Sequence, residues 1–335
     1  MAYAFQLEDF EALGVLAAAG MRATVLACDR GRASADAGRI PIAGSVVSLS
    51  ESGALREVAV GCNGRIPPED GSCKGYPSDH GETGAIRIIR DFGGVDWRNT
   101  VFATTLSPCI MCTRTLEALY ARGLRSLVIA ESKNFRGAEH RLDALPGFTI
   151  VRLTEPSIMT CMQTFARRYP WDWAADIGEV PPRASKHKGI LDKAHVEGER
   201  WWELLAEGEA AVVDEGGSLS KALDGRLASG GNPCQAAVAC AIGKAGSSVN
   251  LRECALVWKS TGTACLEAFG QTSLGACELF RPAALVTRGP VASCLLEPLR
   301  AVGVAIVEVG SQVAPTTRSG PCIDSSRSRS RSRER

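Results

Sequence analysis

Residues 79–93, DHGETGAIRIIRDFG, and residues 101–120, VFATTLSPCIMCTRTLEALY, decide the fold of this chain. His80 and Glu82 stand at the start of one helical pattern, and Cys109 and Cys112 open a second. Cysteines at this spacing lie on one face of a helix, and a helix N-terminus favours the thiolate that binds metal. One imidazole and two thiolates form a zinc set whose fourth position is left to water, as in catalytic sites. We therefore expect Zn²⁺ on His80, Cys109 and Cys112, with Glu82 as a proton-transfer group beside it.

Each motif alone has a simpler interpretation. A lone C-x-x-C is often a structural zinc site or a redox pair, and H-x-E occurs by chance, as in His195-Val196-Glu197, which no C-x-x-C follows. A structural site of four thiolates needs a second close cysteine pair, and the sequence has none at suitable spacing. The combination, in this order and at two helix starts, favours the catalytic interpretation.

Composition places the chain among ordinary soluble proteins. It has 335 residues, 45% of them hydrophobic and 22% charged, with a formal net charge of +1. Length alone predicts two domains, and the charge gives no reason to expect nucleic-acid or membrane binding over the whole surface. The 13 cysteines show no disulfide framework. The start lacks a basic signal-peptide region, and no run is long enough to span a bilayer. We expect a cytoplasmic, possibly nuclear, protein.

Hydrophobic periodicity predicts an α/β fold in the first half. An initial hairpin is followed by alternating helices and strands, which is typical of a three-layer α/β/α sandwich with a mixed sheet. Two metal-bearing helices that share one ion must lie on the same side of that sheet. Helices are expected at 8–28 (with a break at Gly20), 81–92, 108–122 and 156–170, and strands at 39–50, 54–64, 97–106, 124–132 and 147–155.

Six short stretches give residues 37–180 a family resemblance. They are IPIAG, GCNG, DHGET, ATTLSPCIMC, the NF of ESKNFRG, and WDWAADIGE. On these stretches the segment resembles fungal-type cytosine deaminase, within the cytidine deaminase-like fold. The resemblance implies a Zn²⁺-dependent hydrolase that converts cytosine to uracil and ammonia in pyrimidine salvage. The tail WDWAADIGE is the most specific stretch, because the zinc ligands are shared by deaminases of many substrates.

The resemblance also implies a role for each site residue. His80, Cys109 and Cys112 would bind zinc, and Glu82 would shuttle protons. Asn63 and the backbone at Gly81 would hold the polar edge of the pyrimidine, and Asp176 would accept a hydrogen bond from its exocyclic amine. The ring would lie between Trp173 and Phe135, in a pocket completed by Ile42, Leu106 and Ser107. Each residue also has a simpler structural interpretation when it is considered alone. Ile42 and Leu106 could be ordinary core residues, Trp173 could pack at a helix end, and Asn63 could be a turn residue.

The second half carries a faint echo of the first. We expect a linker at 181–196, followed by a second α/β domain at 197–312 that opens with a helical pattern at 199–215. NPCQAAVACAIG can be laid on DHGETGAIRIIR, and ECALVWKST on NTVFATTLS. Pro233 then stands in the place of His80, Gln235 in that of Glu82, and Ala268 in that of the second cysteine, which leaves Cys265 alone. This predicts a degenerate, non-catalytic deaminase-like domain that packs on the first in place of a homodimer partner. An unrelated small α/β domain is the alternative.

Residues 313–335 end in SSRSRSRSRER, a basic low-complexity tail. Such a tail is expected to be disordered. It either binds RNA or phosphorylation-dependent partners, or is merely solvated. Three functions thus stay open: a cytosine deaminase acting on the free base, a deaminase of another nucleobase or of RNA, and a two-domain scaffold whose second domain is idle.

Overall fold

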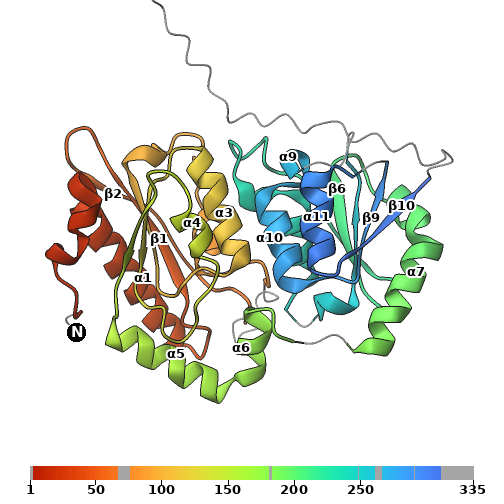
Figure 1. The fold of residues 1–335 in the computed structure, drawn as a ribbon, viewed down its shortest axis with the longest axis horizontal. Coiled ribbons are helices and arrows are strands. Elements are labelled where there is room, and N and C mark those ends of the chain that lie inside the picture. The colour runs from red at the N-terminus through yellow and green to blue at the C-terminus, as the bar shows by residue number, and fades with distance from the viewer. Residues whose placement is uncertain are drawn as a thin grey trace, which may run out of the picture.

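Two five-stranded sheets lie side by side in the chain (Figure 1). The computed structural model describes residues 3–66, 76–180, 183–247, 249–260, 266–289 and 291–310. The predictions for Cys265 and for the tail 313–335 lie outside the described residues, as does the one for the Ala268 side chain.

The first sheet has the strand order β2-β1-β3-β4-β5. Strand β1 runs antiparallel to β2 and β3, whereas β3, β4 and β5 are parallel. The sheet is therefore mixed, as predicted. Its strands are β1 (Ala43–Leu49), β2 (Leu55–Cys62), β3 (Thr100–Thr104), β4 (Ser126–Ile129) and β5 (Thr149–Arg152).

Helices cover both faces of this sheet, so the predicted three-layer sandwich is confirmed. Side chains alternate along β1: Val47 packs with α1 (Ala17–Asp36) and α5 (Pro156–Arg168), and Val46 packs on the opposite face. That opposite face carries α2 (Gly81–Arg87), α3 (Ile110–Ala121) and α4 (His140–Asp143). The two metal-bearing helices, α2 and α3, thus share one face of the sheet.

The N-terminal helix bends earlier than expected. A 3₁₀ segment, η1 (Leu7–Leu16), precedes α1, and the break falls at Gly14, whose φ is 55°, rather than at Gly20. Gly20 lies inside α1, where its missing side chain leaves room for Leu13, since a Cβ there would stand 2.4 Å from Leu13 Cδ1. By length and composition, Leu7–Asp36 is the one helical segment among the described residues that could cross a membrane. Here it is a core helix, with its apolar side buried on the sheet.

The second sheet repeats the topology of the first. Its order is β10-β9-β8-β6-β7, with β6 antiparallel to β7 and β8, and with β8, β9 and β10 parallel. Read from the opposite edge, each strand has a counterpart of the same direction in the first sheet, as the sequence echo predicts. Its strands are β6 (Glu209–Val213), β7 (Leu219–Leu223), β8 (Ala255–Trp258), β9 (Ala284–Arg288) and β10 (Ala305–Val309).

Helices also flank this second sheet on both faces. One face carries α7 (Ala184–Glu203), and the other carries α8 (Ala237–Ala245), α10 (Gln271–Phe280) and α11 (Ser293–Ala301). The short elements are α6 (Pro170–Asp176), α9 (Leu266–Phe269), η2 (Trp97–Asn99), η3 (Pro233–Gln235) and η4 (Leu251–Glu253).

Two sequence predictions near the junction are wrong. Most of the supposed linker, 181–196, belongs to helix α7, which buries Ile190, Ala194 and Trp201 against the second sheet at helical spacing. Basic residues on the exposed side of α7 obscure this period in the sequence. The expected helix at 199–215 ends at Glu203, and its remainder contains strand β6, because Gly208 (φ 76°) turns the chain.

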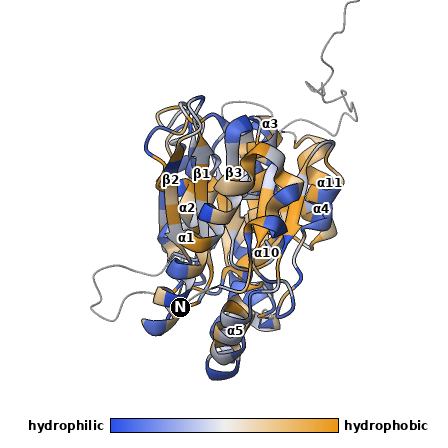
Figure 2. Cartoon of the chain, turned by 90° about the vertical axis from the view of Figure 1, so that its left-hand side faces the viewer, coloured by the Kyte–Doolittle hydropathy of each residue, from blue (hydrophilic) through white to orange (hydrophobic). Residues whose placement is uncertain are grey.

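The two halves meet through α3 and α10, which occupy equivalent positions in their sheets. Gly275 permits the close crossing, since a Cβ there would lie 2.7 Å from Met111 Cα. Arg114 forms two hydrogen bonds to Glu278, at 2.9 and 2.8 Å. Cys109, Met111 and Cys112 belong to the same buried cluster as the core of the second half. Figure 2 shows hydrophobic colour on helix α10, which contributes Leu274, Ala276 and Cys277 to this cluster.

Candidate active site

Two helix N-termini bring the predicted metal ligands together. His80 is the N-cap of α2, with Glu82 in its first turn. Cys109 is the N-cap of α3, and Cys112 lies in the first turn of that helix. All four side chains are buried. The two N-termini supply a favourable field for the thiolates.

The geometry of the three donors fits zinc. Ligand atoms of His80, Cys109 and Cys112 all lie within 4.8 Å of one another, and they form the only such group among the described residues. His80 Nδ1 lies 3.3 Å from Cys109 Sγ. Tetrahedral zinc with usual bond lengths separates a nitrogen and a sulfur ligand by about 3.5 Å. The separation of the His80 and Cys109 donor atoms is thus close to the one that a bound zinc ion would impose.

Asp176 stands behind the imidazole of His80. His80 Nε2 is buried and makes no hydrogen bond, but it lies 3.4 Å from Asp176 Oδ1, within ion-pair distance. A carboxylate in this position fixes the orientation of a metal-binding imidazole. Asp176 Oδ1 also accepts a hydrogen bond from Asn63 Nδ2, at 2.9 Å.

The surroundings of the three metal ligands shift their pKa values in different directions when no metal is bound. Burial lowers the pKa of His80, but Asp176 and Cys109 outweigh it and raise the pKa to about 10. Burial opposes the Cys109 thiolate, yet hydrogen bonds from Cys112 and His80 hold its pKa well below the usual value. Burial raises the pKa of Cys112. Without metal, Cys109 is therefore the thiolate and Cys112 the thiol.

Glu82 has the protonation behaviour of a general acid–base group. Burial, followed by the nearby Cys109 sulfur, raises its pKa to about 7. Thr104 Oγ1 donates a hydrogen bond of 3.0 Å to Glu82 Oε1 and orients the carboxyl group. A group with a pKa near neutrality both accepts and donates protons efficiently.

A small cavity adjoins these groups, with about 10 Å³ open to the centre of a water-sized group. This is room for about one water molecule beside the metal donors. Of the residues implied by the family resemblance, Ile42, Leu106, Ser107, Phe135 and Asp176 line it together with His80, Glu82 and Cys109; Ile177 lines it as well. The sequence reasoning missed Ile177, although it directly follows Asp176 in the WDWAADIGE stretch.

The other predicted substrate residues lie outside this lining. The ring of Trp173 meets Phe135 edge-on, with centroids 6.0 Å apart, and so supports the wall from behind. Both functional ends of the Asn63 amide are engaged, since its Oδ1 accepts from the backbone N of Arg65 at 3.0 Å and its Nδ2 donates to Asp176. Gly81 packs against β1, where a Cβ would lie 2.7 Å from the Ala43 backbone.

Comparisons with known proteins identify the family. Residues 19–129 match the model of the cytidine and deoxycytidylate deaminase zinc-binding region. Cytosine deaminase from Candida albicans (strain SC5314 / ATCC MYA-2876) is 30% identical over 154 residues, which cover 46% of this chain and 93% of that protein. The chain belongs to the cytidine and deoxycytidylate deaminase family.

The solved structures that match part of this chain include proteins described as deaminases of other bases. A structure from a study of tRNA:A34 deaminases is 23% identical, with a TM-score of 0.29, and covers 39% of this chain and 97% of that one. A guanine deaminase from Nitrosomonas europaea is 21% identical, with a TM-score of 0.32, and covers 43% of this chain and 82% of that one.

Proposed function

We propose that the chain hydrolyses free cytosine to uracil and ammonia, as a step of pyrimidine salvage. The lining of the cavity beside the metal donors carries this proposal, because it gathers Glu82, Asp176 and two of the donors, His80 and Cys109, next to apolar walls. The 30% identity to a cytosine deaminase, spanning 93% of that protein, supports the same substrate.

The chain's own residues account for the proton transfers. His80, Cys109 and Cys112 would hold zinc, which when bound acts as a Lewis acid and makes water a nucleophile at neutral pH. Glu82 takes one proton from the attacking water and passes it to the ring N3 of cytosine. It then transfers the second proton of that water to the exocyclic nitrogen. The C4–N bond breaks and ammonia leaves, so water and cytosine give uracil and ammonia.

Recognition of the base falls to Asp176 and the apolar walls. A carboxylate oxygen of Asp176 accepts a hydrogen bond from the exocyclic amine, while Phe135 and Leu106 hold the flat ring. A buried acceptor discriminates strongly, because a ligand without the donor leaves it unpaired. Ser107 positions the wall rather than the base, since its Oγ accepts from Gly137 N at 2.9 Å.

Ammonia release from the zinc-loaded, full-length protein tests the substrate. Cytosine, cytidine, guanine, adenine and single-stranded RNA are compared at equal concentration. We expect cytosine to be turned over fastest by a wide margin. Faster release from guanine, adenine or RNA contradicts the proposal, and absence of turnover with every substrate favours a scaffold function.

We also propose that the second half takes the place of a second subunit. Helix α10 is the counterpart of α3 and packs on it, as two copies of one domain pack in a homodimer. Outside the first half, the described residues hold no further cluster that could bind a metal. Gel filtration should give the mass of a monomer, 35.4 kDa; a dimer mass contradicts this arrangement.

A further inference from the structure

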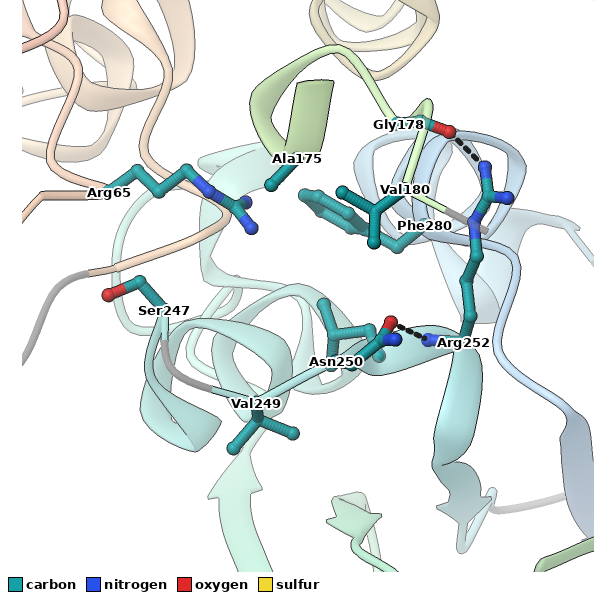
Figure 3. Close-up of a pocket in the computed structure, with 10 residues that line it drawn as sticks. Arg65, Ala175, Gly178, Val180, Ser247, Val249, Asn250, Arg252 and Phe280 are labelled. Atoms are coloured by element: carbon teal, nitrogen blue, oxygen red, sulfur yellow. Dashed lines mark hydrogen bonds between the residues drawn. The ribbon is translucent and has the colours of Figure 1, made fainter. Parts of the chain in front are cut away.

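A second, larger cavity lies between the two halves of the chain (Figure 3). About 140 Å³ of it is open to the centre of a water-sized group, which is room for several water molecules or a small ion. The first half contributes Arg65, which follows β2, and Gly178, which follows α6. The second half contributes Ser247, Asn250, Arg252 and Phe280. None of the proton-transfer or recognition steps proposed above uses this cavity.

Arg65 is the unusual residue of the cavity. Its side chain is only 8% exposed, and its Nη1 is buried without a hydrogen-bond partner. No described carboxylate lies within ion-pair distance of it. The guanidinium stands over the ring of Phe280, with Cζ 5.8 Å from the ring centroid. Figure 3 shows it pointing from the first half into the cavity.

A buried N–H group without a partner is costly, and Nη1 of Arg65 has lost its water and gained no acceptor among the described residues. Burial accordingly lowers the pKa of Arg65, and the more distant Asp176 and Asp172 offset the effect only in part. Guanidinium groups almost never deprotonate in proteins. An anion from outside the chain would relieve this cost.

The rest of the wall also favours an anion. Arg252 supplies a second guanidinium, which donates to the carbonyl oxygen of Gly178. Burial and the nearby Arg281 lower the pKa of Arg252. Ser247 and Asn250 add uncharged polar groups, and neither Asp nor Glu is among the described residues that line the cavity. The lining is thus cationic and partly apolar.

We propose that this cavity binds a small oxyanion, a phosphate or carboxylate group, with the Arg65 guanidinium as its principal partner. The planar fork of arginine matches both groups in bidentate fashion. The site lies beside the active site, because the backbone N of Arg65 donates to Asn63 Oδ1 and Asn63 donates to Asp176. Its ligand is bound by both halves at once.

Isothermal titration calorimetry on the zinc-loaded, full-length protein tests the site. Inorganic phosphate and succinate are titrated separately at constant ionic strength, with chloride as the control titrant. We expect at least one to bind with one-to-one stoichiometry, and the two arms tell a phosphate site from a carboxylate site. Arg65→Gln should weaken that binding about tenfold or more, the usual loss for a charge-assisted hydrogen bond.

Two further variants complete the test. Arg90→Gln removes an exposed arginine of the same half and should leave the dissociation constant unchanged. If Arg65→Gln does not fold, Ser247→Asp decides, because a carboxylate on the cavity wall should repel the anion and weaken its binding. Absence of binding by both anions, or equal binding by the wild type and Ser247→Asp, overturns the proposal. Heat of binding does not depend on cytosine turnover, so the two proposals fail separately.

Discussion

The ring of Phe280 meets the ring of His80 edge-on, with centroids 6.5 Å apart and an interplanar angle of 85°. Phe280 ends α10 in the second half, and His80 caps α2 in the first. The second half, whose described residues hold no metal-binding cluster, thus helps to fix the imidazole of His80 in the first half. Edge-to-face ring pairs of this kind add about 0.5–1.5 kcal/mol beyond the apolar area they bury.

Phe280→Ala should therefore affect both stability and the active site. Phe280 is 5% exposed, and truncation of a buried phenylalanine usually costs about 3–5 kcal/mol. Urea unfolding measures this loss, and steady-state kinetics should show a raised KM for cytosine. Phe280→Leu, which keeps most of the volume, should lose less than half as much. Unchanged kinetics in the alanine variant would mean that the ring contact has no bearing on the site.

Glu82→Gln should retain zinc and lose turnover. The amide keeps the shape of the side chain and the hydrogen bond from Thr104, but it cannot carry a proton between water and base. The expected fall in kcat is about 10²–10⁴-fold. Elemental analysis and ammonia release measure the two properties on one preparation. Glu51→Gln, an exposed position, serves as the control; a Glu82 variant with near-normal kcat removes Glu82 from the mechanism.

Zinc binding should release protons. His80, with a pKa raised to about 10, and Cys112, with a raised pKa, are protonated at pH 7.5 in the metal-free chain, whereas Cys109 is ionised. The metal must displace about two protons, so its apparent affinity should rise about a hundredfold per pH unit in this range. A pH indicator in weak buffer measures the release. An affinity independent of pH between 6 and 8 is incompatible with this assignment of ligands.

Asp176→Asn should impair catalysis far more than metal content. The amide presents a donor in place of an acceptor toward the exocyclic amine and toward His80 Nε2, which lies 3.4 Å from Oδ1. We expect kcat/KM for cytosine to fall on the order of a hundredfold at saturating zinc. The exposed Asp172→Asn is the matched control. Should Asp176→Asn bind zinc normally and act on cytosine normally, the role of Asp176 in recognition is refuted.

Because α3 and α10 cross closely at Gly275, alanine substitutions at Gly275 and at Gly189 should change stability in opposite directions. Gly275→Ala places a Cβ 2.7 Å from Met111 Cα and should destabilise the protein by about 1–3 kcal/mol through overpacking. Gly189→Ala in α7 meets nothing within 4 Å and should stabilise it by about 0.5–1 kcal/mol. Urea midpoints at equal m-values compare the two. Equal effects would show that the helix crossing is looser than described.

Sequence spacing predicted the site residues that lie close together along the chain. The surroundings of other site residues depend on tertiary contacts that spacing does not reveal. The metal donors and Glu82 were predictable because His80 and Glu82 open one helix and Cys109 and Cys112 open another, and helix geometry sets the separation within each pair. Phe280 and Arg65 acquire their surroundings from segments far along the chain, which no periodicity reveals. The sequence echo predicted the repeated strand order, yet helix α7 was mistaken for a linker because its basic face dominates its composition.

The repetition of one topology in a single polypeptide has a consequence for behaviour at low abundance. Two separate subunits part on dilution, whereas two halves joined by a short connection remain at millimolar effective concentration of each other. The contact of Phe280 with His80 therefore persists however scarce the protein becomes. The second half is also free to change its outward surface, provided that α10 keeps its buried contacts with α3.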